Sequence, residues 1–206
     1  MIYFYSGTPG SGKSYHVAKD IYSKIQHGRN IIANFDINYD MIPGKKKGYF
    51  FHKDNYDLTT QWLYDFAEIC HKRDKRGKII EGQTWVVIDE CQLIFNCRSW
   101  TDKGRMEWCS FFTQHRKYGY NIILVSQFDR LIDKAIRSLI EYEYKHRKVN
   151  NFGSAGFLIG LLCLGHPIFC CVEYWYGVKE KCSVSFMMGH KKYYRLYDSY
   201  KLFDAA

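Results

Sequence analysis

The sequence is poor in the residues that mark chains without a packed core. It has only three prolines among 206 residues, and 47% of its residues are hydrophobic, which excludes a disordered tail or a proline-rich linker. The eight cysteines form no C-x-x-C pair, and several fall inside apolar runs. The eight histidines are scattered and show no metal-ligand spacing. We therefore expect buried, reduced thiols and structural histidines rather than disulfides or a zinc site.

Long apolar segments are also missing. The longest apolar run, residues 155–164, holds ten residues, whereas a helix needs about 20 to span a bilayer. The N-terminus has no basic stretch ahead of an apolar one, so no secretory signal peptide is expected. The chain as given is expected to be soluble, and it is compatible with the cytosolic part of a longer membrane protein.

Acidic residues are the scarcer charge. Lysine and arginine total 30 against 21 aspartates and glutamates, a formal net charge of +9. This balance favours anionic partners such as a nucleotide, a nucleic acid or an acidic membrane surface. The basic run at residues 71–78 is either a solvated helix end or a contact for nucleic acid or acidic lipid, and its sequence leaves both open.

The sequence does contain one complete motif, G-x-x-x-x-G-K-[ST], at residues 7–14 near the N-terminus. It predicts a phosphate-binding loop whose glycines let successive backbone N–H groups point at a nucleotide. An apolar, strand-like run (residues 2–5) precedes it, and a helical pattern (residues 13–26) follows, as the motif requires. We expect ATP and Mg²⁺ as cofactors, with the Lys13 ammonium on the β- and γ-phosphates and the Ser14 hydroxyl on the metal. The predicted nucleotide-binding residues are Gly7, Thr8, Pro9, Gly10, Ser11, Gly12, Lys13, Ser14 and Tyr15.

A pair of carboxylates follows the apolar run at residues 84–88, which is typical of a strand buried on both faces. Ligands in open parallel sheets bind at the carboxyl ends of the strands. We therefore assign Asp89 to the Mg²⁺ shell and Glu90 to the general base that polarises the attacking water. The alternative for both residues is a helix N-terminal cap.

Two further residues are candidates for catalysis. Gln127 ends the next predicted strand, where its side chain can orient the attacking water at the γ-phosphate. Arg116, at the end of a predicted helix, can present its guanidinium to the γ-phosphate of a neighbouring subunit. Arg98 and Arg130 are weaker candidates for that role, and ordinary polar positions are the alternative for all four.

Alternating strands and helices over residues 1–150 predict a mostly parallel α/β sheet. Residues 40–57 are expected to form an exposed loop, and residues 151–206 a C-terminal extension that packs on the same domain with an antiparallel hairpin and a docked aromatic tail. The helix over 59–71 is expected to turn Trp62, Phe66 and Ile69 inward, and the helix over 102–118 to turn Met106, Cys109 and Phe112 inward. Asp129 is expected to cap a short helix. The predicted strands are 2–5, 30–34, 84–88, 121–125, 142–149, 168–176 and 182–187.

Several segments together resemble one family, the zonular occludens toxin family, which includes the filamentous-phage morphogenesis ATPase. The resemblance covers about residues 2–150 well, and its most particular part is the F-N-x-R-S-W run after the acidic pair. The segments that carry it are the phosphate loop and residues 87–91, 95–100, 115–119, 122–127 and 133–138.

The resemblance implies a P-loop ATPase of the additional-strand type, related to DNA-pumping motors. Such proteins are thought to work as homo-oligomeric rings, such as hexamers, at the cytosolic face of the bacterial inner membrane. There they drive extrusion of a single-stranded-DNA phage while coat protein is added. The resemblance supports the roles given above to Lys13, Ser14, Asp89, Glu90 and Arg116. Members usually continue through a membrane span, and we find no such span in this sequence, so an inner-membrane partner segment is implied by relatives alone.

Three other functions fit a phosphate loop. A kinase for a nucleotide or other small molecule would need a lid with several arginines, which we do not find. A GTP-dependent switch would need an N-K-x-D guanine reader, and none occurs. A scaffold that binds nucleotide without turnover stays open.

Overall fold

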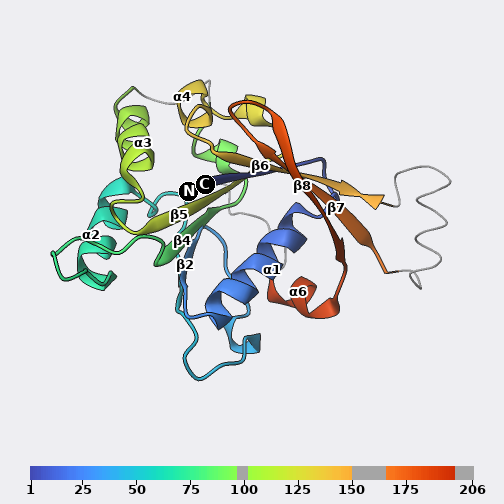
Figure 1. Cartoon of the computed structure of the whole chain (residues 1–206), viewed down its shortest axis with the longest axis horizontal. Coiled ribbons are helices and arrows are strands. Elements are labelled where there is room, and N and C mark those ends of the chain that lie inside the picture. Colours follow the sequence, from blue (N-terminus) through green and yellow to red (C-terminus); the bar gives the residue numbers. More distant parts are fainter. Residues whose placement is uncertain (97–101, 150–165, 198–206) are drawn as a thin grey trace.

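A single mixed sheet organises the chain in the computed structural model, which describes residues 1–96, 102–149 and 166–197 (Figure 1). Its eight strands follow the order β3-β2-β4-β5-β1-β6-β7-β8. The pairings from β3 to β6 are all parallel, and those of β6 with β7 and β7 with β8 are antiparallel. The predicted parallel sheet with a C-terminal antiparallel hairpin is confirmed. The strands are β1 (Ile2–Ser6), β2 (Asn30–Ala33), β3 (Phe50–His52), β4 (Thr84–Ile88), β5 (Tyr120–Val125), β6 (Tyr142–Lys148), β7 (Ile168–Trp175) and β8 (Glu180–Met188).

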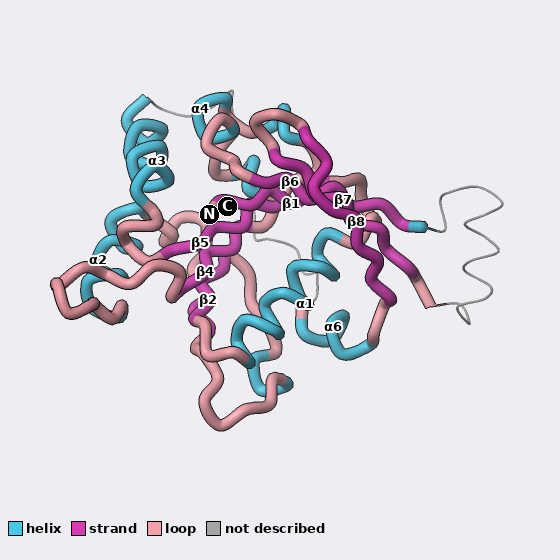
Figure 2. The backbone as a smooth tube through the Cα atoms, in the orientation of Figure 1, coloured by secondary structure: helices cyan, strands magenta, loops and turns pink. Residues whose placement is uncertain are grey.

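Helices cover both faces of this sheet (Figures 1 and 2). The helices α1 (Lys13–Gln26) and α6 (Lys191–Leu196) contribute to the hydrophobic cluster on one face. On the other face pack α2 (Thr60–Cys70), α3 (Asp102–Gln114) and α4 (Lys134–Arg137). Short 3₁₀ turns span Tyr39–Met41, Cys91–Leu93 and Asp129–Leu131. Within the described residues, no helix has the length and apolar character needed to cross a membrane.

The two cores follow from the alternation of side chains along the central strands. In β5, Ile122 and Leu124 face the α2–α3 cluster, whereas Ile123 and Val125 face the α1 cluster. All four are fully buried, which explains why the strand reads as a continuous apolar run. Strand β5 lies between β1 and β4, so one extra strand separates the strand before the phosphate loop from the strand before the acidic pair. This is the additional-strand arrangement.

The segment at residues 40–57 differs from the prediction of an exposed loop. It contains β3, which pairs in parallel with β2, with Ile31 opposite Phe50. The strand has three residues, and its first two are only half-buried. Such a short edge strand leaves no measurable periodicity in the sequence, which is why a loop was predicted.

The inward faces of two helices were also predicted in part wrongly. Ile69 is 83% exposed and Met106 is 71% exposed. The α2 core positions are Leu63, Phe66 and Ala67, and those of α3 are Trp108, Phe111 and Phe112. In both helices the buried residues follow an i, i+3, i+4 pattern, whereas the predicted sets are spaced by four and three residues in α2 and by three and three in α3.

The short helix after β5 begins later than predicted. Asp129 opens a 3₁₀ turn, and the cap is Asp133, whose carboxylate accepts a hydrogen bond from the Ala135 N–H at 2.8 Å. The aromatic tail does dock back: Leu196 and Tyr197 are buried in the α1 cluster, and residues 198–203 lie outside the described residues.

Candidate nucleotide-binding site

The predicted phosphate loop joins the carboxyl end of β1 to the start of α1. Gly12, the residue before the helix, has φ +99° in the left-handed region, and a Cβ there would stand 2.5 Å from the Phe169 ring. Gly7 has φ +145°, and a Cβ there would stand 2.6 Å from the backbone oxygen of His146. Both positions therefore require glycine for conformation and for space.

Lys13 is folded back over the loop that carries it. Its ammonium donates hydrogen bonds to the Gly7 carbonyl at 2.6 Å and to the Thr8 carbonyl at 3.3 Å. The side chain is largely buried, and this burial lowers the pKa of Lys13, while the charges of Glu90 and Asp89 act in the opposite sense. The ammonium therefore shares one electrostatic environment with both members of the acidic pair. The two motifs that the sequence separates by about eighty residues converge.

The backbone of Asp89 is hydrogen-bonded by the side chain of Asn34, which is not among the predicted site residues. The Asn34 side-chain oxygen accepts a hydrogen bond from the Asp89 N–H, and its amide donates to the Asp89 carbonyl, both at 2.8 Å. The same amide donates to Asn55 Oδ1 at 2.8 Å. Because Asn34 directly follows β2, the neighbour of β4, this clamp fixes where the β4 chain ends and the acidic pair begins.

The Asp89 carboxylate is buried and takes two hydrogen bonds. Its Oδ1 accepts from the Glu90 N–H at 2.8 Å, and its Oδ2 accepts from the Tyr197 hydroxyl at 2.6 Å. Burial raises the pKa of Asp89, and the two hydrogen bonds and Lys13 oppose that rise. The Tyr197 ring packs against Phe35 in a tilted arrangement, with ring centroids 4.1 Å apart. The C-terminal segment thus reaches the carboxylate assigned to the metal, which no local motif could indicate.

Glu90 sits at a sharp turn with φ +44° and ψ +45°, the left-handed conformation that non-glycine residues rarely adopt. At this turn the chain leaves β4 and enters the 3₁₀ turn at Cys91–Leu93, so the backbone changes direction at Glu90. The Gln92 amide donates a hydrogen bond to its Oε2. Backbone strain of this kind concentrates at functional sites, because the surrounding structure must hold it.

Gln127 lies beside the phosphate loop, as expected from its place after β5. Its backbone carbonyl accepts a hydrogen bond from the Gly7 N–H at 3.3 Å, and the preceding Ser126 N–H donates to the Tyr5 carbonyl at 3.1 Å. The ends of β1, β5 and β4 therefore meet at one edge of the sheet.

The residues present fit a magnesium–nucleotide group. Two buried side-chain oxygens in the described part of the chain lack a hydrogen-bond partner, Ser11 Oγ in the phosphate loop and Gln92 Oε1 beside Glu90. The first belongs to the predicted nucleotide-binding residues, and the second lies next to the predicted general base. Hydroxyl and carboxylate oxygens, supplied here by Ser14 and Asp89, are the ligands that Mg²⁺ prefers.

Tyr15, a predicted nucleotide-binding residue, directs its side chain to the C-terminal extension. Its hydroxyl donates to the Met188 carbonyl at 2.6 Å, and its ring packs on Phe169 at a centroid distance of 5.3 Å. With Phe169 against Gly12, the hairpin of β7 and β8 packs directly on the loop and its helix. This contact was not foreseen.

Arg116 lies at the amino-terminal ends of the parallel strands, opposite the end that carries the phosphate loop. It precedes β5 and pairs with Glu81, which precedes β4, through Nε at 3.1 Å and Nη2 at 3.0 Å. It is therefore remote from the phosphate loop of its own chain, and only a neighbouring subunit's nucleotide could lie next to it. Arg98 and the rest of the segment at 97–101 lie outside the described residues.

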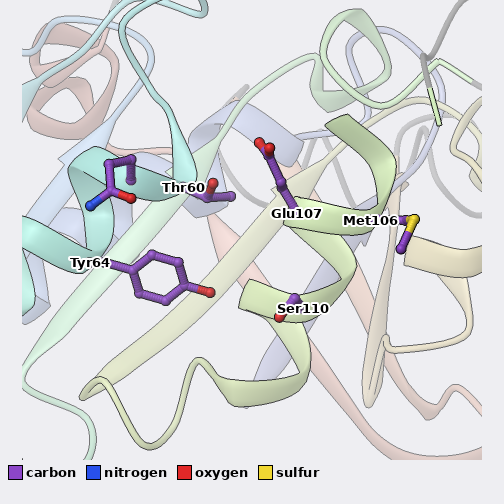
Figure 3. A pocket seen from close by; sticks show the side chains of 6 residues that line it. Thr60, Tyr64, Met106, Glu107 and Ser110 are labelled. Carbon is purple, nitrogen blue, oxygen red and sulfur yellow. The ribbon is translucent and has the colours of Figure 1, made fainter. Parts of the chain in front are cut away.

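A separate groove of about 420 Å³ lies between α2 and α3 (Figure 3). It contains none of the predicted site residues. Thr60, Gln61 and Tyr64 line it from α2, and Met106, Glu107 and Ser110 line it from α3. It lies on the face of the sheet opposite α1.

Comparison with known protein families and curated sequences gives one consistent result. The family model described as zonular occludens toxin (Zot) matches residues 1–201. The Gene 1 protein of Enterobacteria phage fd is 29% identical over 144 residues, covering 68% of this chain and 39% of that protein. The Gene 1 protein of Salmonella phage IKe is 26% identical over 175 residues, covering 80% of this chain and 45% of that protein. The chain therefore spans less than half the length of these curated relatives.

Solved structures of similar fold agree. The N-terminal domain of zonular occludens toxin from Neisseria meningitidis has a TM-score of 0.54 at 20% identity, covering 96% of this chain and 98% of that one. The genome packaging NTPase B204 of Sulfolobus turreted icosahedral virus 2, in complex with ATP-gammaS, has a TM-score of 0.53 at 14% identity, covering 90% and 95%. A further ATPase domain of known structure has a TM-score of 0.59 at 8% identity, covering 95% and 83%. At these identities the likeness shows a shared P-loop ATPase fold.

Proposed function

The chain belongs to the zonular occludens toxin family, and from this premise we propose that it is the ATP-hydrolysing motor domain of a filamentous-phage assembly protein. It would drive assembly and extrusion of a single-stranded-DNA phage at the cytoplasmic face of the bacterial inner membrane. The Gene 1 proteins of phages fd and IKe support the phage context. The ATP-gammaS-bound packaging NTPase, which shares the fold, supports nucleotide as the ligand.

One observation carries the proposal: Lys13 and the carboxylates of Asp89 and Glu90 converge at the carboxyl edge of β1 and β4. In an open parallel sheet this edge is where ligands bind. A phosphate loop alone would also suit a kinase or a switch. An adjacent buried aspartate and a strained glutamate across one extra strand suit hydrolysis.

We assign the steps to this chain's own groups as follows. The loop backbone and the Lys13 ammonium bind the β- and γ-phosphates, exchanging the Gly7 and Thr8 carbonyls for phosphate oxygens. Ser14 and Asp89 would hold Mg²⁺, which supplies charge neutralisation of the phosphates when bound. Glu90 accepts a proton from the attacking water, and Gln127 helps to orient that water.

The same proposal includes partners and organisation. Residues 1–150 form the ATPase core, and 151–206 form an extension that packs on the same domain. The working form is a homo-oligomeric ring that handles coat protein and packaged single-stranded DNA. A segment outside this chain would connect it to the inner membrane, since these residues cover less than half of the curated relatives.

Steady-state hydrolysis of ATP and GTP tests the enzyme assignment. We expect Glu90→Gln to lower kcat for ATP by roughly 10²–10⁴-fold, because proton transfer to a positioned base contributes about that factor. Nucleotide affinity, measured with a fluorescent ATP analogue, should change only a few-fold.

Glu68→Gln is the matched control, because this exposed carboxylate lies on α2 and pairs with Arg73, which has no role in the proposed mechanism. It should leave the rate unchanged. An unaltered rate in Glu90→Gln would remove the base assignment, and no turnover by the wild-type chain would favour a nucleotide-binding scaffold.

A further inference from the structure

Three metal-ligating side chains from distant parts of the sequence meet behind the phosphate loop. His16 comes from α1, His146 from β6 and Cys171 from β7. Their ligand atoms all lie within 4.8 Å of one another. His146 and Cys171 are direct register partners across the antiparallel β6–β7 pair, so their side chains point to the same face, and α1 places His16 over them.

The cluster is enclosed. His146 is 2% exposed and Cys171 is 1% exposed, while His16 is half-buried. A neutral imidazole is the form that offers a nitrogen lone pair to a metal, and the hydrogen bonds of the two rings show which nitrogen carries it.

Each ring is oriented by a second partner. His146 Nδ1–H donates to the Ser6 carbonyl at 3.0 Å, which leaves Nε2 pointing into the cluster as an acceptor. That Nε2 accepts from His16 Nδ1–H at 2.8 Å. On its outer side, His16 Nε2 lies 3.7 Å from Asp20 Oδ1. His146 therefore has the support typical of histidine ligands of metal sites, a carbonyl on the nitrogen away from the metal, whereas His16 has a nearby carboxylate beyond hydrogen-bond distance.

Asp20, the carboxylate nearest to His16, is itself fixed by two hydrogen bonds. The Tyr5 hydroxyl donates to its Oδ2 at 2.7 Å, and the Lys24 ammonium donates to the same oxygen at 2.8 Å. The Tyr5 ring also stacks on His16 at a centroid distance of 4.8 Å. The histidine on the helix is therefore held from two sides.

We propose that His16 Nδ1, His146 Nε2 and Cys171 Sγ form a binding site for a transition-metal ion that accepts imidazole and thiolate, with Zn²⁺ as the occupant. Thiolate sulfur and imidazole nitrogen are both ligands that Zn²⁺ takes, and three protein ligands leave its fourth position to water. The proton of His16 Nδ1 would move to Nε2, facing Asp20, and the thiol proton would leave to solvent. The two ring nitrogens would separate from 2.8 Å to about 3.3 Å, the spacing of two ligands on one tetrahedral zinc ion.

The site would join the phosphate-loop helix to the C-terminal hairpin, because its ligands come from α1 and from the β6–β7 pair. It does not depend on nucleotide hydrolysis, so it can be tested separately from the proposed function. The site could not be predicted from the sequence, because 130 residues separate the two histidines and the cysteine lies on another strand. Spacing rules detect only ligands that are near one another in sequence.

Metal binding to the purified full chain tests the site without an activity assay. The protein is unfolded in chelator, refolded with one equivalent of Co²⁺ or Zn²⁺, and desalted. Co²⁺ should give visible d–d bands and a thiolate-to-metal charge-transfer band in the near ultraviolet. At free Zn²⁺ about 100-fold above Kd, the melting temperature should rise by about 5–10 °C.

Cys171→Ser should abolish the charge-transfer band and weaken Zn²⁺ binding by about 100-fold. Cys170→Ser is the matched control, since it alters the neighbouring buried cysteine outside the cluster, and it should bind as wild type. If Cys171→Ser does not refold, His16→Gln, which alters a half-buried ligand, serves instead and should also weaken binding. The proposal is overturned if wild type retains no metal, or if the cluster variants bind Zn²⁺ as well as Cys170→Ser does.

Discussion

Tyr197 and Asp89 form a residue pair that links the end of the described chain to its centre. The hydroxyl donates to a buried carboxylate at 2.6 Å, and the ring is buried against Phe35. A buried carboxylate that loses a donor keeps its desolvation cost without compensation. This single contact therefore couples the position of the C-terminal segment to the charge of the residue assigned to Mg²⁺.

Tyr197→Phe should lower the free energy of unfolding by about 1–3 kcal/mol, the range for a buried hydrogen bond to a charged group. Urea denaturation followed by circular dichroism measures it. Tyr194→Phe, at a position that is 45% exposed, should change stability by less than about 0.5 kcal/mol. Equal losses in the two variants would mean that the contact with Asp89 contributes nothing.

At the scale of elements, His115 joins the end of α3 to the start of β1. Its Nδ1–H donates to the Phe112 carbonyl, and its Nε2 accepts from the Met1 ammonium at 2.9 Å. Burial, reinforced by that ammonium, lowers the pKa of His115 to about 4. The folded state therefore holds this ring neutral where the unfolded chain, with a pKa of about 6.5, would protonate it.

A histidine whose pKa is lowered by folding contributes its full stability at pH values above its pKa in the unfolded chain. That contribution is lost as the pH falls from about 6.5 towards 4. Between pH 7.5 and pH 5 we expect the free energy of unfolding to fall by about 2 kcal/mol through this group. Urea midpoints at the two pH values measure the loss. His115→Gln should reduce it by about that amount, whereas His27→Gln, at the exposed end of α1, should leave it intact. A full acid-induced loss in His115→Gln would contradict the assignment.

The elements nearest the phosphate loop were the most predictable from sequence. Strands β1, β4 and β5 are buried on both faces, so their apolar runs stand out, and each ends in the polar residues that the site needs. Edge strand β3 was predicted as a loop, and in the inner faces of α2 and α3 the positions Ile69 and Met106 were predicted wrongly, whereas Phe66 and Phe112 are buried as predicted. There the outcome depends on which of several apolar positions finds a partner, and a single sequence does not reveal that choice.

Residues that support the site from afar escaped prediction for the same reason. Asn34 contacts Asp89 across 55 residues, and Tyr197 does so across 108. An asparagine after a strand and a tyrosine in a tail are unremarkable until the sheet order places them side by side. The catalytic roles of Lys13, Glu90 and Gln127 remain predictions, although the structure brings these residues together.

At the scale of the whole molecule, Arg116 requires a second copy if it is to act on a nucleotide. It lies at the amino edge of the strands, away from the loop of its own chain. We expect the chain to form higher oligomers with Mg-ATP or a transition-state mimic in size-exclusion chromatography with light scattering. Arg116→Ala should lower turnover by about 10³-fold or more, as loss of an arginine finger does, without changing ATP affinity by more than a few-fold.

Lys117→Ala, which removes the neighbouring basic side chain, is the control and should retain turnover. If the chain stays a monomer under every nucleotide condition, Arg116 has no place in the mechanism.

Phe169 of β7 lies against Gly12, the residue that precedes α1, so the C-terminal hairpin and the phosphate loop share a direct contact. Because there is no room for a Cβ at Gly12, a displacement of β7 toward the loop has no free space to enter, and the turn that is proposed to cradle the phosphates must move with it.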